Sequence, residues 1–157
     1  MTSGDSWWTP LTPRLHVVGA EDPVQVTDSL SPTGMSYVAR LDGESMADVD
    51  GVFTQFWEHL RLPSYFGWNW DALSDCLRDL HWLQAERYLV VISRAEDVLS
   101  ETPDERGTFF QVIARATASW ANAPAKVGVG IPFNVVLLCA RENLHLLGRE
   151  VSAFETA

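Results

Sequence analysis

The sequence has few cysteines, few basic residues and no long apolar run. Its two cysteines, Cys76 and Cys139, do not suggest a disulfide framework, because free cysteine usually behaves as a small buried hydrophobe. Residues 1–5 lack the basic flank and apolar core of a secretory signal. No apolar run approaches the roughly 20 residues that a membrane-spanning helix needs. We therefore expect a soluble, cytoplasmic protein without a membrane partner.

Positive charge is also scarce. The chain holds 11 lysines and arginines against 21 aspartates and glutamates, which gives a net charge of −10 and a pI near 4.6. Nucleic acids and anionic membranes repel such a protein at long range, so we exclude them as main partners. The charge favours a basic protein partner, although an acidic balance also serves solubility alone.

Motifs of common catalytic and cofactor sites are missing. There is no phosphate-binding glycine loop and no Cys-x-x-Cys. The histidines are scattered and lack metal-ligand spacing: His16, His59, His81 and His145. Asp71 and Asp75 could form an acid/base pair, as in glycoside hydrolysis. However, adjacent turns of one exposed helix offer no difference in environment that would separate their pKa values. We expect no catalytic residue, metal or cofactor, and keep a small carboxylate-dependent hydrolase as an alternative.

The composition predicts one main domain preceded by an extension. With 157 residues, of which 46% are hydrophobic and 20% charged, the chain can build one substantial core. Residues 1–35 are rich in Pro, Ser, Thr and Gly, which predicts an irregular N-terminal extension. That segment holds a short strand candidate at residues 15–18, and Trp7 and Trp8 are expected to anchor it against the main body. Residues 36–157 form the predicted domain.

Strands and helices alternate in this domain. Residues 37–41, 88–92 and 133–139 predict strands, the last two buried on both faces. A first helix is expected to be capped by Ser45, with Asp48 in its first turn. Its predicted buried stripe has helical spacing and comprises Val49, Val52, Phe53, Phe56, Trp57 and Leu60.

A third helix has a strong start signal. Thr102 is placed as its cap, Pro103 at the first helical position, and Glu105 where a capping box would need it. Strands separated by helices imply parallel pairing, so the predicted fold class is α/β, with three core strands flanked by helices. Residues 140–157 carry a weaker pattern that leaves their structure open.

The most informative stretch is the helix that Asn69 is expected to cap. At about 100° per residue, Asp71, Asp75 and Asp79 fall in one stripe, each about 40° from the last. The opposite side is apolar and comprises Ala72, Leu73, Cys76, Leu77 and Leu80. Like charges four residues apart repel, and only Arg78 lies close enough to offset them. The stripe is therefore a candidate binding surface, with a merely solvated face as the alternative.

Aromatic residues crowd the loop before this helix. Tyr65, Phe66, Trp68 and Trp70 surround Gly67, a density typical of the anchor residues of protein interfaces. We expect Phe66 and Trp70 in the core, and Tyr65 and Trp68 on the surface.

These residues carry a specific resemblance. The pattern Leu-Pro-x-Tyr-Phe-Gly-x-Asn-x-Asp-Ala-Leu-x-Asp-Cys-Leu of residues 62–77 resembles the signature of the barstar family, intracellular inhibitors of guanyl-specific ribonucleases such as barnase. The resemblance covers roughly residues 36–139. It implies a small parallel sheet flanked by helices, whose loop and acidic helix plug the nuclease's active site. The matched inhibitor positions are Tyr65, Gly67, Asn69, Asp71 and Asp75.

The chain departs from the best-known member of that family at several positions. Ser74 stands where that member has Trp, Trp70 where it has Leu, and Trp68 where it is acidic. Arg115 aligns with an acidic residue of its third helix, so the partner is expected to differ from barnase itself. The expected partner-binding residues are Tyr65, Gly67, Trp68, Asn69, Trp70, Asp71, Ser74, Asp75, Arg78, Asp79 and Arg115.

The sequence thus predicts a non-enzymatic inhibitor that binds a basic, extracellular ribonuclease of the barnase type stoichiometrically. An immunity or regulatory module for another toxin or protein is the alternative from the class of binding proteins.

Overall fold

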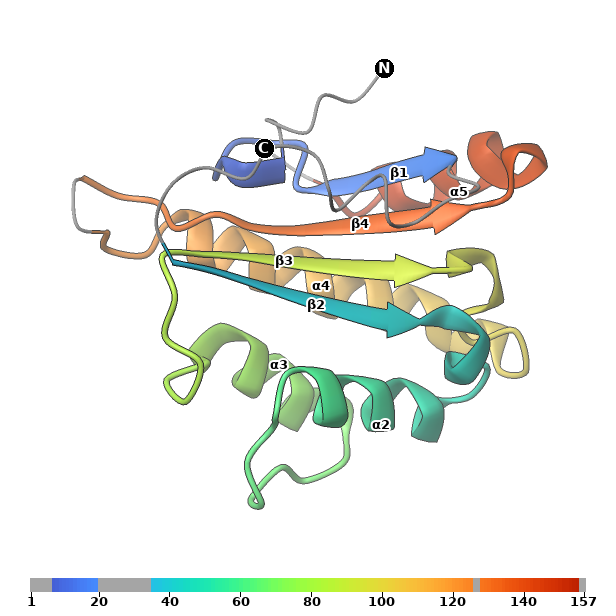
Figure 1. Ribbon diagram of the computed structural model, residues 1–157. Coiled ribbons are helices and arrows are strands. Elements are labelled where there is room, and N and C mark those ends of the chain that lie inside the picture. Colours follow the sequence, from blue (N-terminus) through green and yellow to red (C-terminus); the bar gives the residue numbers. More distant parts are fainter. Residues whose placement is uncertain (1–6, 20–34, 126–127, 156–157) are drawn as a thin grey trace.

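The computed structural model describes residues 7–19, 35–125 and 128–155, and its centre is a parallel sheet. Four strands lie in the order β1-β4-β3-β2, and every neighbouring pair is parallel (Figure 1). Their bounds are β1 Leu15–Gly19, β2 Ser36–Asp42, β3 Arg87–Ser93 and β4 Phe133–Cys139. The predicted α/β class is confirmed. The strand candidate of the N-terminal segment adds a fourth strand, β1, to the three expected ones.

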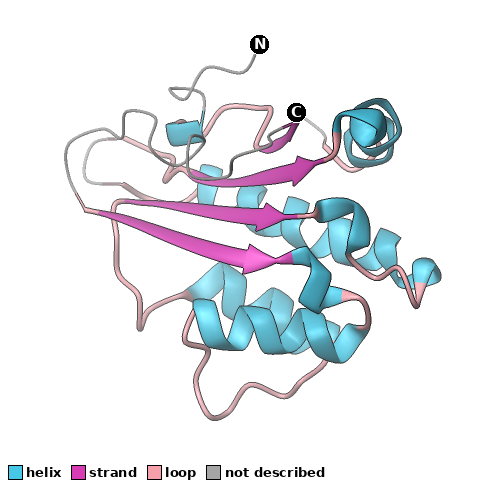
Figure 2. Cartoon of the chain, turned by 45° about the vertical axis from the view of Figure 1, so that its right-hand side comes forward, coloured by secondary structure: helices cyan, strands magenta, loops and turns pink. Residues whose placement is uncertain are grey.

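The longer helices all pack on one face of this sheet. They are α2 Val49–His59, α3 Trp70–Asp79, α4 Arg106–Ala121 and α5 Leu144–Ser152, and short 3-10 turns join them: η2 Gly43–Met46, η3 Ala95–Asp97, η4 Pro103–Glu105 and η5 Arg141–Asn143. Figure 2 shows the helices gathered to one side of the strands. This arrangement follows from right-handed crossovers between adjacent parallel strands. Within the described residues, no helix is both long enough and apolar enough to cross a membrane.

The main core lies between the helices and the sheet. Alternate side chains of each strand face the helices, among them Ala39, Val90 and Val135, and pack against buried residues of α2–α5. The two central strands, β3 and β4, are buried along almost their whole length. Such burial on both faces explains their unbroken apolar sequence.

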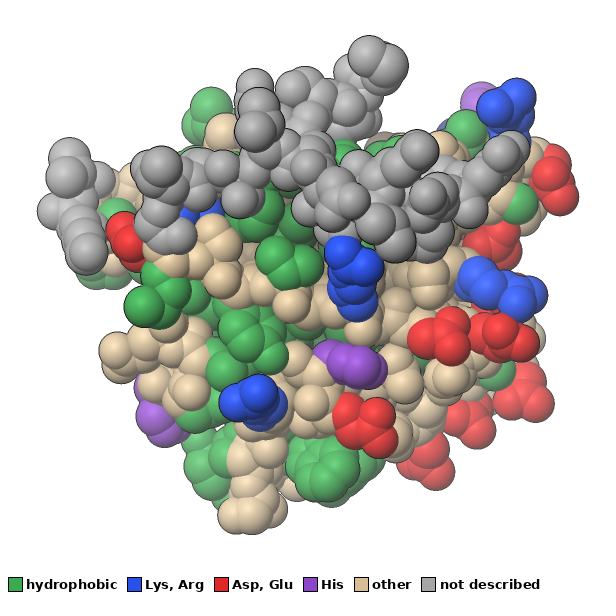
Figure 3. All heavy atoms as spheres, in the orientation of Figure 1, with side chains coloured by type: hydrophobic (Ala, Val, Ile, Leu, Met, Phe, Trp, Pro, Cys, Tyr) green, Lys and Arg blue, Asp and Glu red, His purple; other side chains and the backbone are tan. Residues whose placement is uncertain are grey.

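A smaller apolar cluster covers the opposite face of the sheet. The Trp7 side chain is 4% exposed and packs against Leu89, Val91, Val136 and Leu138, with Trp8 beside it. The prediction that these tryptophans anchor the N-terminal segment is confirmed. Figure 3 views the molecule from this face and shows acidic side chains gathered at its right-hand end, where the strands terminate.

The predicted start of α2 is wrong by one turn. Asp48, not Ser45, is the N-cap, and its Oδ1 accepts a hydrogen bond of 2.8 Å from the Gly51 N–H. Ser45 belongs instead to the 3-10 turn η2, where its hydroxyl donates to Asp42. The chain therefore needs a tight turn after β2 before the α-helix can begin.

The predicted cap of α4 is also wrong. The Thr102 side chain makes no capping hydrogen bond, Pro103–Glu105 form the 3-10 turn η4, and α4 begins at Arg106. The groups that a capping box would join have other partners. The Glu105 N–H donates to the Thr102 carbonyl at 2.9 Å, and the Thr102 N–H donates to the Leu99 carbonyl at 3.1 Å. The Glu105 carboxylate accepts a 2.7 Å hydrogen bond from the Trp70 indole.

The C-terminal segment, left open by its pattern, is η5 followed by α5. Leu147 and Val151 bury the inner side of α5. Glu150 holds the Arg106 guanidinium through contacts of 2.7 and 2.8 Å, which ties α5 to the start of α4. A two-pronged contact of this kind fixes orientation as well as distance.

Candidate protein-binding surface

Asn69 joins the aromatic loop to α3. Its backbone is extended, its Oδ1 accepts from the Ala72 N–H at 2.8 Å, and its Nδ2 donates to the Gly67 carbonyl at 3.2 Å. The predicted N-cap is confirmed. One side chain thus fixes the first turn of the helix and the shape of the loop that leads into it.

The two opposed faces of α3 are confirmed. Asp71, Asp75 and Asp79 are exposed, whereas the apolar side buries Leu73, Cys76 and Leu77. A helix whose inner face is fixed in the core presents its outer carboxylates in a set order. The structure thus brings the predicted acidic residues together on one surface.

Part of the acidic stripe is already paired within the protein. The Arg78 guanidinium lies 2.8 Å from Asp75 Oδ1, and the two side chains are 47% and 76% exposed. His81 Nδ1 lies 3.0 Å from Asp79 Oδ2. Among the described residues, no basic side chain forms an ion pair with Asp71. Because exposed ion pairs contribute about 0–1 kcal/mol, a partner's cations can replace these contacts at little cost.

The aromatic loop divides between core and surface as predicted. Phe66 is 4% exposed, whereas Tyr65 and Trp68 are 65% and 46% exposed. Trp70 is half-buried: its ring centroid lies 5.0 Å from that of Phe53, and its indole donates to Glu105. Trp70 therefore positions the loop against α2 and α4. A direct partner contact by Trp70 or by the exposed Gly67 stays a prediction.

Trp57 departs from its predicted place in the buried stripe of α2. It is 43% exposed, and its ring centroid lies 5.9 Å from that of Trp68. The stripe buries Val52, Phe53 and Phe56, and Trp57 lies one residue, about 100°, beyond it. Helical spacing alone had included Trp57 in the predicted buried stripe. Its contact with Trp68 depends on the way the loop folds back along α2.

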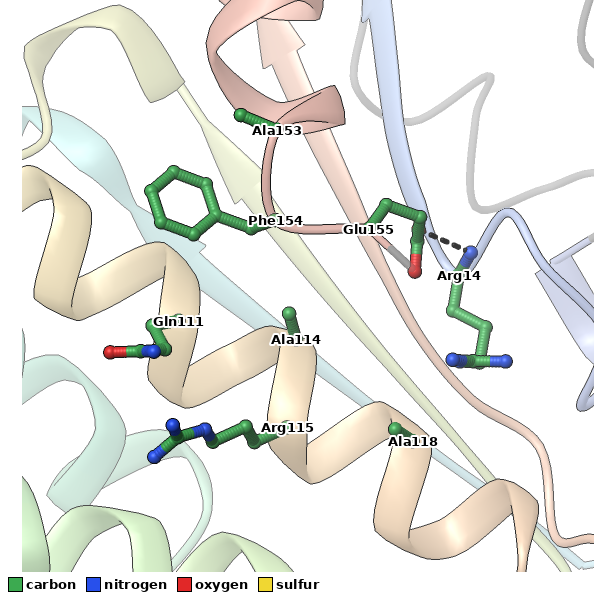
Figure 4. A pocket seen from close by; sticks show the side chains of 8 residues that line it. All are labelled: Arg14, Gln111, Ala114, Arg115, Ala118, Ala153, Phe154 and Glu155. Carbon is green, nitrogen blue, oxygen red and sulfur yellow. Dashed lines mark hydrogen bonds between the residues drawn. The ribbon is translucent and has the colours of Figure 1, made fainter. Parts of the chain in front are cut away.

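Ser74 on α3 and Arg115 on α4 are the remaining predicted binding residues. Ser74 is half-buried, and its carbonyl accepts from Arg78 Nε. Arg115 is exposed on α4 and lines a pocket of about 260 Å³ with Arg14 and Glu155, in which its guanidinium points away from Arg14 (Figure 4). Among the described residues, no acidic side chain forms an ion pair with Arg115. The role of Ser74 and Arg115 in binding stays a prediction.

Two other groups of this surface, Tyr65 and Cys76, have raised pKa values and stay protonated. Burial, together with the Asp79 and Asp75 carboxylates, raises the pKa of the Cys76 thiol. Partial desolvation and the charges of Asp79 and Cys76 raise the pKa of Tyr65. At neutral pH the Tyr65 hydroxyl is therefore a hydrogen-bond donor, and Cys76 is a poor nucleophile. The described residues contain no group of three or more His, Cys, Asp or Glu side chains arranged to hold a metal ion.

Comparison with known families identifies the family of this chain. The family model of barstar, the barnase inhibitor, matches residues 36–137. The chain belongs to the barstar family. The match runs from the start of β2 into β4 and includes the aromatic loop and α3. No curated protein matches the sequence.

The family is that of the barnase inhibitor. The barstar match does not include β1 and α5, which lie beside one another at one edge of the molecule. The aromatic loop and α3 lie on the side of β2, at the other edge of the sheet (Figure 1). The segments outside the match therefore lie apart from the aromatic loop and α3, although Arg14 and Glu155 line the pocket that contains Arg115.

Proposed function

We propose that this protein is a non-catalytic inhibitor that binds a secreted guanyl-specific ribonuclease one-to-one and blocks its active site. The observation that carries the proposal is the joint exposure of Asp71, Asp75 and Asp79 on α3 and of Tyr65 in the preceding loop. The barstar family supports the class of partner. Cytoplasmic action, which would protect the producing cell from its own enzyme, belongs to the same proposal.

Charge complementarity explains how such a surface inhibits. A ribonuclease binds the phosphates of RNA with cationic side chains. Carboxylates held at the spacing of a rigid helix occupy those cations through charge-assisted hydrogen bonds. Tyr65 brings both an apolar ring and a hydroxyl donor to the edge of this contact. RNA is then excluded because its phosphates and the carboxylates compete for the same groups.

The departures from the family pattern point to a distinct partner within this class. Arg115 adds a cation to α4, and Ser74 gives α3 a small polar side chain. A cation facing a basic cleft repels it, so Arg115 selects against nucleases whose cleft is basic at that point. We expect weaker inhibition of barnase than of a nuclease with an acidic or neutral group there.

Asp75 provides the central test. Asp75→Asn keeps the size of the side chain but removes its charge, and leaves a desolvated cation of the nuclease unpaired. Because breaking a buried ion pair costs about 3–5 kcal/mol, affinity should fall at least a hundredfold. The measurement is a titration of ribonuclease activity, with stability followed by urea unfolding. Glu142→Gln, which removes an exposed charge from η5, is the matched control.

Two results would contradict the proposal. Inhibition by Asp75→Asn within threefold of wild type would remove α3 from the active-site contact. A wild-type protein that acts substoichiometrically, by turning over a substrate, would favour the carboxylate-dependent hydrolase instead. Complete loss of ribonuclease activity at a one-to-one ratio of the two proteins supports the proposed inhibitor.

A further inference from the structure

We propose that Trp57 and Trp68 together form an aromatic shelf that extends the docking surface from α3 onto α2 and receives an arginine side chain of the partner. The inference rests on the proposed function, because it takes the partner to be a basic protein. It adds a residue, Trp57, that the inhibitor pattern of the loop and α3 does not include.

The shelf is built from two elements. Trp57 comes from α2 and Trp68 from the loop, and their ring centroids lie 5.9 Å apart with planes inclined at 43°. Phe66, which is buried, supports Trp68 from beneath at 5.2 Å. Both tryptophans are more than two-fifths exposed, at 43% and 46%. Figure 3 shows hydrophobic side chains along the lower edge of the molecule, where Figure 1 places α2 and this loop.

The backbone holds Trp68 in a costly conformation. Its φ is +54°, in the left-handed region that a bulky side chain rarely adopts. Such conformations cost about 1–3 kcal/mol and persist where the surrounding structure imposes them, often at binding sites. Here the left-handed conformation sets a large ring, 46% exposed, beside Trp57. Solubility and stability would both favour the opposite arrangement.

Charge identifies the occupant. The loop that carries Trp68 continues directly into α3, whose exposed face holds Asp71, Asp75 and Asp79. The arginine nearest to Trp57 and Trp68 in the sequence is Arg61. It lines a separate pocket with Tyr37 and Arg40 at the edge of β2. Indole faces attract cations most strongly among aromatic rings, and arginine stacks on them while keeping its hydrogen bonds. An arginine beside the cationic cleft of a ribonuclease can stack on the two tryptophan rings while the carboxylates of α3 attract its charge.

The first test measures binding of barnase and of other guanyl-specific ribonucleases by titration calorimetry. Trp57→Ala should weaken binding about tenfold, between the effects of an exposed and of a fully desolvated cation–π contact. Trp57→Phe keeps an aromatic face and should stay within threefold, whereas Trp57→Leu keeps the apolar area alone and should lose as much as Ala. Leu146→Ala, at a residue that is 67% exposed on α5, is the matched control.

These outcomes separate the shelf from the proposed function. If Asp75→Asn abolishes binding but Trp57→Ala does not weaken it, the inhibitor stands and the shelf is overturned. If Trp57→Leu binds like wild type, the occupant is apolar, and the arginine contact is overturned.

A second experiment tests the shelf without a nuclease, and it applies if none of the tested nucleases binds. N-acetyl-arginine amide is titrated against the protein while the indole N–H resonances are followed by NMR, with N-acetyl-norleucine amide as the uncharged probe. The resonances of Trp57 and Trp68 should move selectively with the arginine probe, and less so in Asp71→Asn. Trp82 and Trp120 serve as internal controls, because their indoles donate to the backbone carbonyls of Leu60 and Leu77. Equal shifts at all four indoles, or none, would overturn the shelf.

Discussion

The Asp75 carboxylate lies 2.8 Å from a guanidinium of its own helix, so the unbound surface is less negative than its sequence suggests. Arg78 thereby competes with any cation that a partner brings to Asp75. Arg78→Ala should release the carboxylate and add one negative charge to the field. Because an exposed pair of this kind is worth about 0.2–1 kcal/mol, we expect association with a cationic nuclease to quicken by at most about fivefold.

Stopped-flow association measures this effect. Arg149→Ala, which removes an exposed arginine of α5, makes the same change in net charge at the far side of the sheet. Equal acceleration by both variants would show that net charge alone matters. Slower binding by Arg78→Ala would show that the arginine itself contacts the partner.

His16 gives the fold a dependence on pH. Burial lowers its pKa below the ordinary 6.5, although the hydrogen bond to Asn134 and the charge of Glu155 oppose the shift. The folded state therefore holds a neutral imidazole that the unfolded chain protonates more readily. The stability that His16 contributes is complete above pH 6.5 and is lost as pH falls below that value toward the folded pKa.

Urea unfolding at neutral pH and at a pH well below 6.5 tests whether stability falls on acidification, as we expect. Wild type should lose more stability on acidification than His16→Gln, whose side chain does not titrate. The same loss in both proteins would place the acid-sensitive group elsewhere.

At the scale of elements, the cap of α3 couples stability to binding. Asn69→Ala removes the acceptor of the Ala72 N–H and the donor to the Gly67 carbonyl. Loss of an N-cap costs about 1 kcal/mol, and the loop that carries Trp68 loses its tie to the helix. We expect a lower unfolding midpoint and a weaker complex. Asn69→Asp, which keeps the acceptor and suits the helix dipole, should preserve stability but not the Gly67 contact.

The pair of variants separates the two roles of this side chain. Both are measured by urea unfolding and by inhibition of the nuclease. If Asn69→Ala lowers stability but leaves the affinity for the nuclease unchanged, the loop keeps its shape without the Asn69 side chain, and the cap does not couple stability to binding.

For the whole molecule, a net charge of −10 predicts electrostatic steering toward a basic partner. Association should slow steeply as salt rises, because screening shortens the reach of the field to about 10 Å or less. Dissociation, which breaks contacts already formed, should change much less. Stopped-flow mixing at low and high ionic strength measures both rates. A flat salt dependence of association would mean that the stripe only keeps the protein soluble.

Sequence by itself determined the features that depend on near neighbours. The two faces of α3, the Asn69 cap and the continuous apolar runs of β3 and β4 follow from helical periodicity, local hydrogen bonding and burial. The motif of residues 62–77 also pointed to the barstar family, which the family comparison confirmed. Each of these rests on residues a few positions apart, where geometry is nearly independent of the rest of the chain.

Tertiary structure decided what depends on distant partners. The Glu105 carboxylate, expected to close a capping box with Thr102, instead accepts a hydrogen bond from Trp70, 35 residues away. The strand at residues 15–19 becomes a fourth member of the sheet because β4 offers it an open edge. Trp57, predicted as core, is half exposed because the core buries only the stripe of Val52, Phe53 and Phe56, and Trp57 contacts Trp68 of the returning loop instead. Contacts between separated segments carry no local periodicity, so only the folded chain reveals them.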